Sequence, residues 1–393
     1  MKKIITVLTA IAIVFQIFTP LRLYFEGGRS LAMLIPSVLI VVYDGLFSRR
    51  SFWPMFFFIL TCLLIMLAGS EYFDFPYLIN FFFAYTCLEH FLVRRDLFYA
   101  KIVLWALYGS LMVLISTSLP LFISMPNLSR LMIDAEENGV MQPIMYWTID
   151  YPTIHALPIY SIPLFFFFKE GKAWIKLFML FFIVAIFVLM FYADATTALI
   201  LNIIVYAVLL LYRPNLSIRK NITRLCGLVV ILLFALNKSV VVEILSMVQP
   251  LFEGSSTYKK IDEIILMITG LGTTGDIEGR EDRLQISLNS FASNPLFPTL
   301  DVNQIGNHNV LFDHIVAMGL IPGITFISFL IERIWRPLRY LNQITKPYYL
   351  LGVLAMLVMG LAKNFFLLLP ACTIVPMLLI AYEMNKQNLQ NSK

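Results

Sequence analysis

Long uninterrupted apolar runs constrain this chain more than any other feature. The segment FWPMFFFILTCLLIMLAG, residues 52–69, contains no charged side chain. A helix needs about 20 apolar residues to cross a bilayer, whereas a membrane strand shows about 10 residues of alternating hydrophobicity. Because these runs are continuous, they predict membrane helices rather than an outer-membrane barrel.

The overall composition agrees with that prediction. Hydrophobic residues make up 60% of the 393 residues and charged residues 13%, against roughly 45–50% and about 25% in soluble domains. This excess excludes a soluble globular or a disordered chain. We therefore predict an all-α membrane protein, a polytopic bundle of about twelve transmembrane helices. The expected spans are residues 4–21, 31–47, 52–69, 75–93, 99–124, 152–168, 174–193, 195–212, 225–246, 308–331, 347–363 and 365–383.

The distribution of Lys and Arg sets the expected orientation. With the N-terminus in the cytoplasm, 20 of the 29 Lys and Arg residues fall on the cytoplasmic side and nine on the other side. Cytoplasmic loops carry such an excess of positive charge. We expect a multi-pass membrane protein with both termini in the cytoplasm.

Two long loops lie on the expected outer side, at about 125–151 and 247–307. Long loops are uncommon unless they are functional. The second loop predicts two short amphipathic helices, at about 261–271 and 279–291, with a stop at the NPLFP stretch. We thus divide the chain into spans one to nine (1–246), an outer loop (247–307) and spans ten to twelve (308–393).

Two arginines in that loop form a candidate anion site. Arg280, Arg283 and Ser287 share one helix face by their spacing. Two guanidinium groups one turn apart can hold phosphate oxygens. The alternative is a solvated surface on which Glu281 and Asp282 neutralise the arginines.

A second candidate lies where the tenth span begins. His308 stands between Asn307 and Asn309 at the expected membrane boundary. A neutral imidazole there can act as a general base. The alternative is a helix cap, in which Asn307 or Asn309 caps the helix and His308 faces water.

Several other polar residues have a functional and a structural interpretation. Lys363 and Arg130, on the expected outer side, are candidate anion-binding residues. We expect Asp313 and His314 to serve packing. Near the cytoplasmic end of span four, Glu89 and His90 lie beside Arg94 and Arg95. We expect a local ion pair among these residues. No spacing in the sequence indicates a metal or nucleotide site.

The region from Gly279 to Gly323 resembles the bacterial O-antigen polymerase (Wzy-type) and O-antigen ligase superfamily. Its members typically show a loop arginine, a proline-containing exit, then His-Asn followed by nine residues and a glycine. Here these are Arg280, NPLFP, His308 with Asn309, and Gly319. The expected number of spans and the large outer loop between spans nine and ten extend the resemblance over most of the chain.

The resemblance implies a metal-independent, inverting glycosyltransferase that needs no cofactor. It would be a multi-pass protein of the bacterial inner membrane, active on the periplasmic face, so that the loop at 247–307 would be periplasmic. The donor would be an oligosaccharide on undecaprenyl diphosphate, with its diphosphate held by Arg280 and assisted by Arg283, Arg130 or Lys363. His308 would take the proton of the acceptor hydroxyl, with Asn309 and Asn307 in support. The other implied partners are membrane lipids and a chain-length regulator protein, and no nucleic acid is expected.

Three functions stay open at this point. A polymerase of O-antigen or a related surface polysaccharide is favoured, because ADATTAL (193–199) lacks the arginine that ligase members often carry at the eighth span. A ligase would transfer the glycan to the lipid A core instead. A polysaccharide or lipid transporter or flippase is the alternative of another class, and it has no need of a base at His308.

Overall fold

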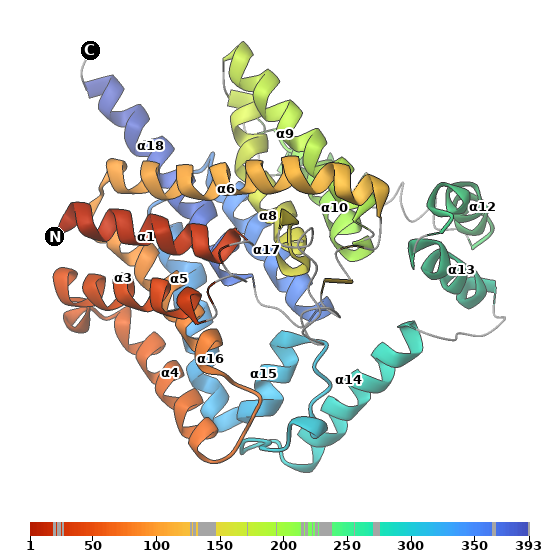
Figure 1. The fold of residues 1–393 in the computed structure, drawn as a ribbon, viewed down its shortest axis with the longest axis horizontal. Coiled ribbons are helices and arrows are strands. Elements are labelled where there is room, and N and C mark those ends of the chain that lie inside the picture. Colours follow the sequence, from red (N-terminus) through yellow and green to blue (C-terminus); the bar gives the residue numbers. More distant parts are fainter. Residues whose placement is uncertain are drawn as a thin grey trace.

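A computed structural model gives the fold of the chain (Figure 1). It describes residues 1–393 apart from positions 19–20, 22–24, 26, 126–127, 129–130, 133–146, 171, 194, 214–215, 217–218, 222, 225–226, 228–237, 255, 270–275, 364–366 and 392–393. Every regular element in the described part is a helix, which confirms the all-α class there.

The amino-terminal helices follow the expected spans closely. They are α1 (Lys2–Ile17), α3 (Gly28–Asp44), the short η1 (Leu46–Ser48), α4 (Phe52–Leu67), α5 (Phe75–Arg94) and α6 (Leu97–Ser124). Two of them begin at a capping aspartate. The Asp74 carboxylate accepts the Tyr77 amide at 2.6 Å, and that of Asp96 accepts the Phe98 amide at 3.0 Å. Each cap satisfies an amide that the first helical turn leaves without a partner.

The remaining helices complete the bundle and its extension. They are α8 (Tyr151–Glu170), α9 (Ala173–Tyr192), α10 (Thr196–Leu211), α12 (Lys238–Val248), η3 (Gln249–Phe252), α13 (Ser256–Thr269), α14 (Asp276–Ser293), η4 (Val302–Gln304), α15 (Val310–Met318), α16 (Leu320–Leu338), α17 (Lys346–Ala362), the π-helical η5 (Leu369–Ile374) and α18 (Val375–Asn391).

Among the helices that the structure describes, three are long and apolar enough to cross a membrane, namely α6, α8 and α9. They correspond to the fifth, sixth and seventh expected spans. Several others are apolar but shorter: α4 and α10 have 16 residues and α17 has 17. At 1.5 Å per residue these reach about 25 Å, somewhat less than a hydrocarbon core of about 30 Å.

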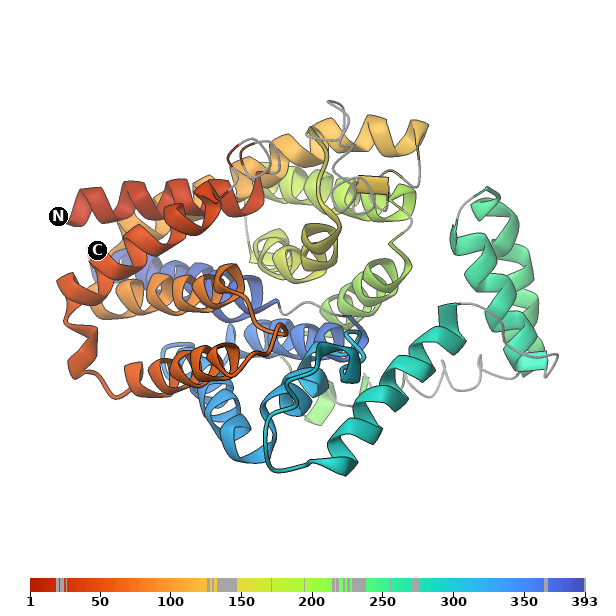
Figure 2. The same ribbon diagram turned by 60° about the horizontal axis from the view of Figure 1, so that its bottom comes forward.

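Side-chain contacts gather the expected cytoplasmic turns at one end of the bundle, which we call the amino-terminal end. Lys2 forms an ion pair with Asp96. The Arg95 guanidinium lies 4.4 Å from the centre of the Tyr340 ring, in the turn after α16. In the same turn, the Asn342 amide donates a hydrogen bond to Glu383 of α18. Both chain ends lie at this end in Figure 2.

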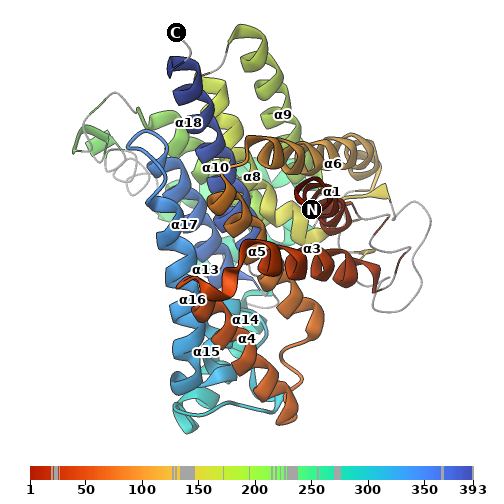
Figure 3. The same cartoon turned by 90° about the vertical axis from the view of Figure 1, so that its left-hand side faces the viewer.

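The expected tenth span, 308–331, is wrong as a single helix. The chain breaks at Gly319, whose φ of 72° ends α15 before α16 begins. The NPLFP stretch causes the break, because the carbonyls of Pro295 and Leu296 accept the amides of Leu320 and Ile321 at 2.8 and 3.2 Å. In Figure 3, α15, α16 and α17 lie together along one flank of the bundle.

The helices α12 and α13 pack on each other and stand apart from the main bundle in Figures 1 and 2. The predicted loop helices at 261–271 and 279–291 correspond to α13 and α14, both of which begin earlier than expected. The expected ninth span, 225–246, is described mainly in its second half, where α12 begins at Lys238 and continues two residues beyond the expected end. The helix α14 leads from this pair back to α15.

Candidate functional site

The turn that carries His308 is organised around the Asp313 carboxylate. Oδ2 of Asp313 accepts the backbone amides of His308 at 2.9 Å and Asn309 at 2.8 Å, and Oδ1 accepts the Ser287 hydroxyl at 2.6 Å. Asn309 caps α15 through its own side chain, which accepts the Phe312 amide at 3.1 Å. The predicted asparagine cap is therefore confirmed at Asn309, and the buried Asp313 serves structure, as expected.

A close backbone approach docks α14 on this turn. The Gly306 amide donates to Ser287 Oγ at 2.8 Å. A Cβ at Gly306 would lie 2.0 Å from the Arg283 carbonyl oxygen, so the contact requires a glycine. Asn307 follows with φ of 51°, a left-handed conformation that Asn tolerates better than most residues. The predicted face of Arg283 and Ser287 is thus the face of α14 that meets the His308 turn.

These contacts enclose a hollow of about 170 Å³ between α14, the turn and the end of α17. Its lining residues are Arg283, Leu284, His308, Asn309, Asp313, Leu361 and Ala362. Arg283, an exposed residue, and His308, a half-buried one, therefore line one space. A cation beside a potential base can stabilise a leaving anion and accept a proton from a nucleophile.

Lys363 reaches this site through its backbone. Its carbonyl oxygen accepts the Val310 amide at 3.1 Å, which fixes the end of α17 to the start of α15. Its ammonium group points instead to α8, where it donates to the Tyr151 hydroxyl at 3.2 Å. The lysine is buried, with 7% of its surface exposed.

The side chains of two predicted anion-binding arginines lie outside the described part of the chain. Arg280 belongs to α14, one turn before Arg283, but its side chain lies outside the described part of the chain. Arg130 lies outside the described residues altogether. The structure therefore brings together Arg283, His308, Asn309 and the Lys363 backbone, with Asn307 in the same turn.

His314, one residue after Asp313, holds α15 against the first half of the chain. Its Nδ1 lies 3.0 Å from the Tyr72 hydroxyl, and Nε2 contacts the hydroxyl of Tyr77. The imidazole is buried among aromatic rings, including Phe73 and Phe326. This is the packing role predicted for it.

The predicted local ion pair at Glu89 is wrong. Glu89 pairs instead with α16, through Arg333 Nη2 at 2.7 Å and Arg336 Nε at 2.6 Å. Arg94 pairs with Asp44. The reason is helical geometry, because residues five apart do not share a face of a helix.

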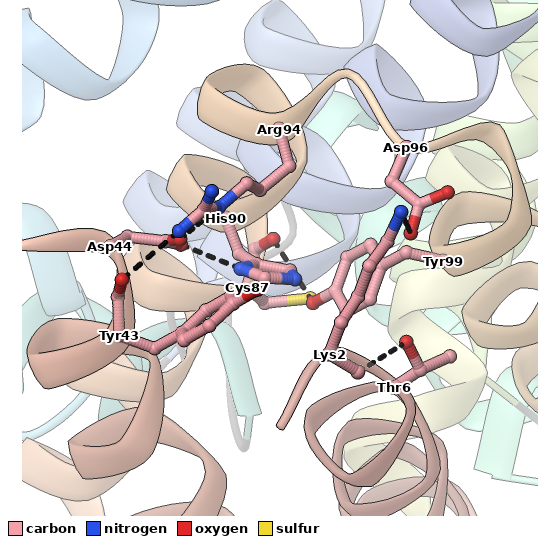
Figure 4. Close-up of polar contacts among 9 residues, drawn as sticks. All are labelled: Lys2, Thr6, Tyr43, Asp44, Cys87, His90, Arg94, Asp96 and Tyr99. Carbon is pink, nitrogen blue, oxygen red and sulfur yellow. Dashed lines mark hydrogen bonds and ion pairs between the residues drawn. The ribbon is translucent and has the colours of Figure 1, made fainter.

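A second set of polar contacts holds α3 on α5 (Figure 4). Residues four apart on α5 do share a face, and both contact the buried Asp44: His90 Nδ1 lies 2.6 Å from Oδ2 and Arg94 Nε lies 2.6 Å from Oδ1. Beside it, Lys2 pairs with Asp96 at 3.1 Å. These contacts fasten the amino-terminal end of the bundle.

The buried cluster around Glu89 was not predicted from the sequence. Glu89 and Arg333 are both almost fully buried, and the Arg333 guanidinium lies 4.5 Å from the centre of the Tyr85 ring. The sequence does contain an indication of this cluster, since Arg333 and Arg336 stand one turn apart on a largely apolar helix. Charges in such helices pair with one another or mark a function.

Within the described residues, no three His, Cys, Asp or Glu side chains gather as a metal site would require. Comparison with known proteins gives no family for the chain, since neither a protein-family model nor a curated protein matches it.

Proposed function

We propose that the chain is a polymerase of O-antigen or a related surface polysaccharide in the bacterial inner membrane, with about twelve spans and both termini in the cytoplasm. It would join oligosaccharide repeat units carried on undecaprenyl diphosphate at the periplasmic face. The observation that carries this proposal is the hollow in which Arg283 and His308 face one space.

The end of the bundle at which the hollow lies supports the proposal. Lys2, Arg94 and Arg95 lie at the amino-terminal end, and His308 lies beside Lys363 and Tyr151 at the other. We call this the His308 end. If the amino-terminal end faces the cytoplasm, as its positive charge favours, the hollow faces the periplasm, where the lipid-linked donor would bind.

The proposed reaction forms one glycosidic bond and breaks one sugar–phosphate bond. The acceptor hydroxyl attacks the anomeric carbon of the donor while its proton passes to His308. The electron pair of the breaking bond leaves with undecaprenyl diphosphate. Arg283, with Arg280 on the preceding turn of α14, would stabilise the charge of this leaving group. Attack opposite the leaving group inverts the anomeric configuration.

A gel of surface polysaccharide tests the proposal. The gene is deleted in the producing strain and restored as the wild type, His308→Ala, Arg280→Ala or the control Arg339→Ala, which removes an exposed charge near the amino-terminal end. We expect deletion, His308→Ala and Arg280→Ala to leave core with a single repeat unit, while Arg339→Ala restores the ladder. A tag on the protein shows that each variant reaches the membrane.

Two other results would contradict the proposal. Bare core with polymer still on the lipid carrier would indicate the ligase. A normal ladder and normal capsule from His308→Ala would remove the proposed base and favour a transporter or flippase.

A further inference from the structure

A second hollow, which we call the polar cavity, opens near the His308 end. It encloses about 280 Å³ between α1, α3, α5, the start of α8 and residues 367–370. Its polar side chains come from four helices and the residue before α8, and they include Gln16, Arg29, Tyr77, Asn80, Asp150 and Thr153. Two larger hollows have apolar linings, apart from Lys101 in one of them.

The polar groups are held in place by bonds to their neighbours. Arg29 Nε donates to Gln16 Oε1 at 2.8 Å, and Asn80 Nδ2 donates to the Pro76 carbonyl at 2.8 Å. Asp150 Oδ1 accepts the Thr153 amide at 3.0 Å. Groups fixed in this way lose little conformational freedom when a ligand binds. Because polar groups are costly to bury without partners, such a cavity suits water or a polar ligand rather than a lipid tail.

Two contacts connect the polar cavity to the hollow at His308. Tyr77 lines the cavity, and its hydroxyl contacts His314, the neighbour of Asp313. Tyr151 stands between two lining residues of the cavity, and its hydroxyl accepts a hydrogen bond from the Lys363 ammonium group. The backbone carbonyl of Lys363 in turn holds the start of α15. In addition, Ala362 lines the first space and Leu367, five residues later, lines the second. The two hollows are therefore neighbours.

The chemistry of the polar cavity fits a sugar. Sugar hydroxyls both donate and accept, which matches a guanidinium and amide donors beside carboxylate and amide acceptors. Phe81 and Leu367 offer apolar wall to the C–H face of a sugar ring. Asp150 disfavours a diphosphate here, because it places a carboxylate in the same space as the Arg29 cation. The volume is close to the lower end of small-molecule sites, roughly 300 Å³.

We propose that the polar cavity binds the terminal sugar of the acceptor glycan and presents its hydroxyl toward His308. This inference rests on the proposed function. It divides the work between two spaces, with the donor diphosphate at Arg283 and the acceptor sugar among Arg29, Asn80 and Asp150.

Site-specific photo-crosslinking tests the inference. The photoreactive residue p-benzoylphenylalanine replaces Asn80 or, in a second variant, Gln16. The matched control position is Leu67, which is 85% exposed at the His308 end of α4. Cells that make the repeat unit are irradiated, the tagged protein is purified under denaturing conditions, and attached glycan is detected with antiserum against the repeat unit. A strain that lacks the first sugar transferase provides protein without glycan.

We expect light-dependent glycan attachment at Asn80 or Gln16 at least fivefold above Leu67, and none without repeat-unit synthesis. Equal labelling at all three positions would overturn the inference. The ladder of His308→Ala is scored in parallel. A lost ladder with equal labelling rejects the acceptor site and keeps the polymerase, whereas an intact ladder with labelling at Asn80 rejects the polymerase and keeps a glycan-binding cavity.

Discussion

Replacing Gly306 by Ala tests whether the close docking of α14 on the His308 turn is needed for function. The new Cβ would lie 2.0 Å from the Arg283 carbonyl oxygen, whereas ordinary contacts begin near 3.4 Å. The turn and α14 must therefore separate by about 1.4 Å to reach an ordinary contact. Such a displacement of reacting groups can cost about 100-fold in rate, which corresponds to about 2.7 kcal/mol. We expect Gly306→Ala to lower the polymerisation rate by about that factor.

The assay is the initial rate of glycosidic bond formation in isolated membranes supplied with lipid-linked repeat units. Rates are normalised to the tagged protein present. Gly323→Ala is the matched control, because a Cβ there meets nothing within 4 Å, and it should keep the wild-type rate. A Gly306→Ala rate within threefold of wild type, at equal protein, would refute the requirement for this contact.

Three further perturbations have defined expectations. Glu89→Gln leaves the buried Arg333 charge without its carboxylate partner, which typically costs 3–5 kcal/mol, so the melting temperature in detergent should fall clearly; an unchanged value would contradict the importance of this pair. Arg283→Ala should shorten the polymer or lower its yield at unchanged protein level, and a normal ladder would make it a surface charge. Gly319→Ala places a Cβ 2.5 Å from the Phe297 carbonyl, so less folded protein should elute in size-exclusion chromatography; wild-type recovery would show that the break between α15 and α16 tolerates a side chain.

The sequence predicts the helices well because each apolar run is continuous and its ends are marked. Asp74 and Asp96 begin helices as aspartate caps do, and the NPLFP stretch follows the end of α14 within one residue. Two local features of the candidate site also follow from the sequence. Asn309 caps α15, and the spacing of Arg283 and Ser287 puts both on the side of α14 that docks on His308.

Features that depend on distant segments could not be predicted in this way. The break at Gly319 arises because the carbonyls of residues 295 and 296 take the amides that begin α16. The partner of Glu89 is another such case, since periodicity identifies the face of α5 but not the helix that packs on it. The direction of the Lys363 side chain, toward Tyr151 rather than the hollow, likewise follows from packing between α17 and α8.

Purified protein with undecaprenyl-diphosphate-linked repeat units as the single substrate gives the most direct test of the proposed function. The products are separated by glycan length, and released undecaprenyl diphosphate is measured in the same reaction. We expect glycans in whole multiples of the repeat unit, one undecaprenyl diphosphate released per bond formed, and neither product from His308→Ala. Unchanged substrate with the wild-type protein, or equal polymer from wild type and His308→Ala, would contradict a polymerase that uses His308 as its base.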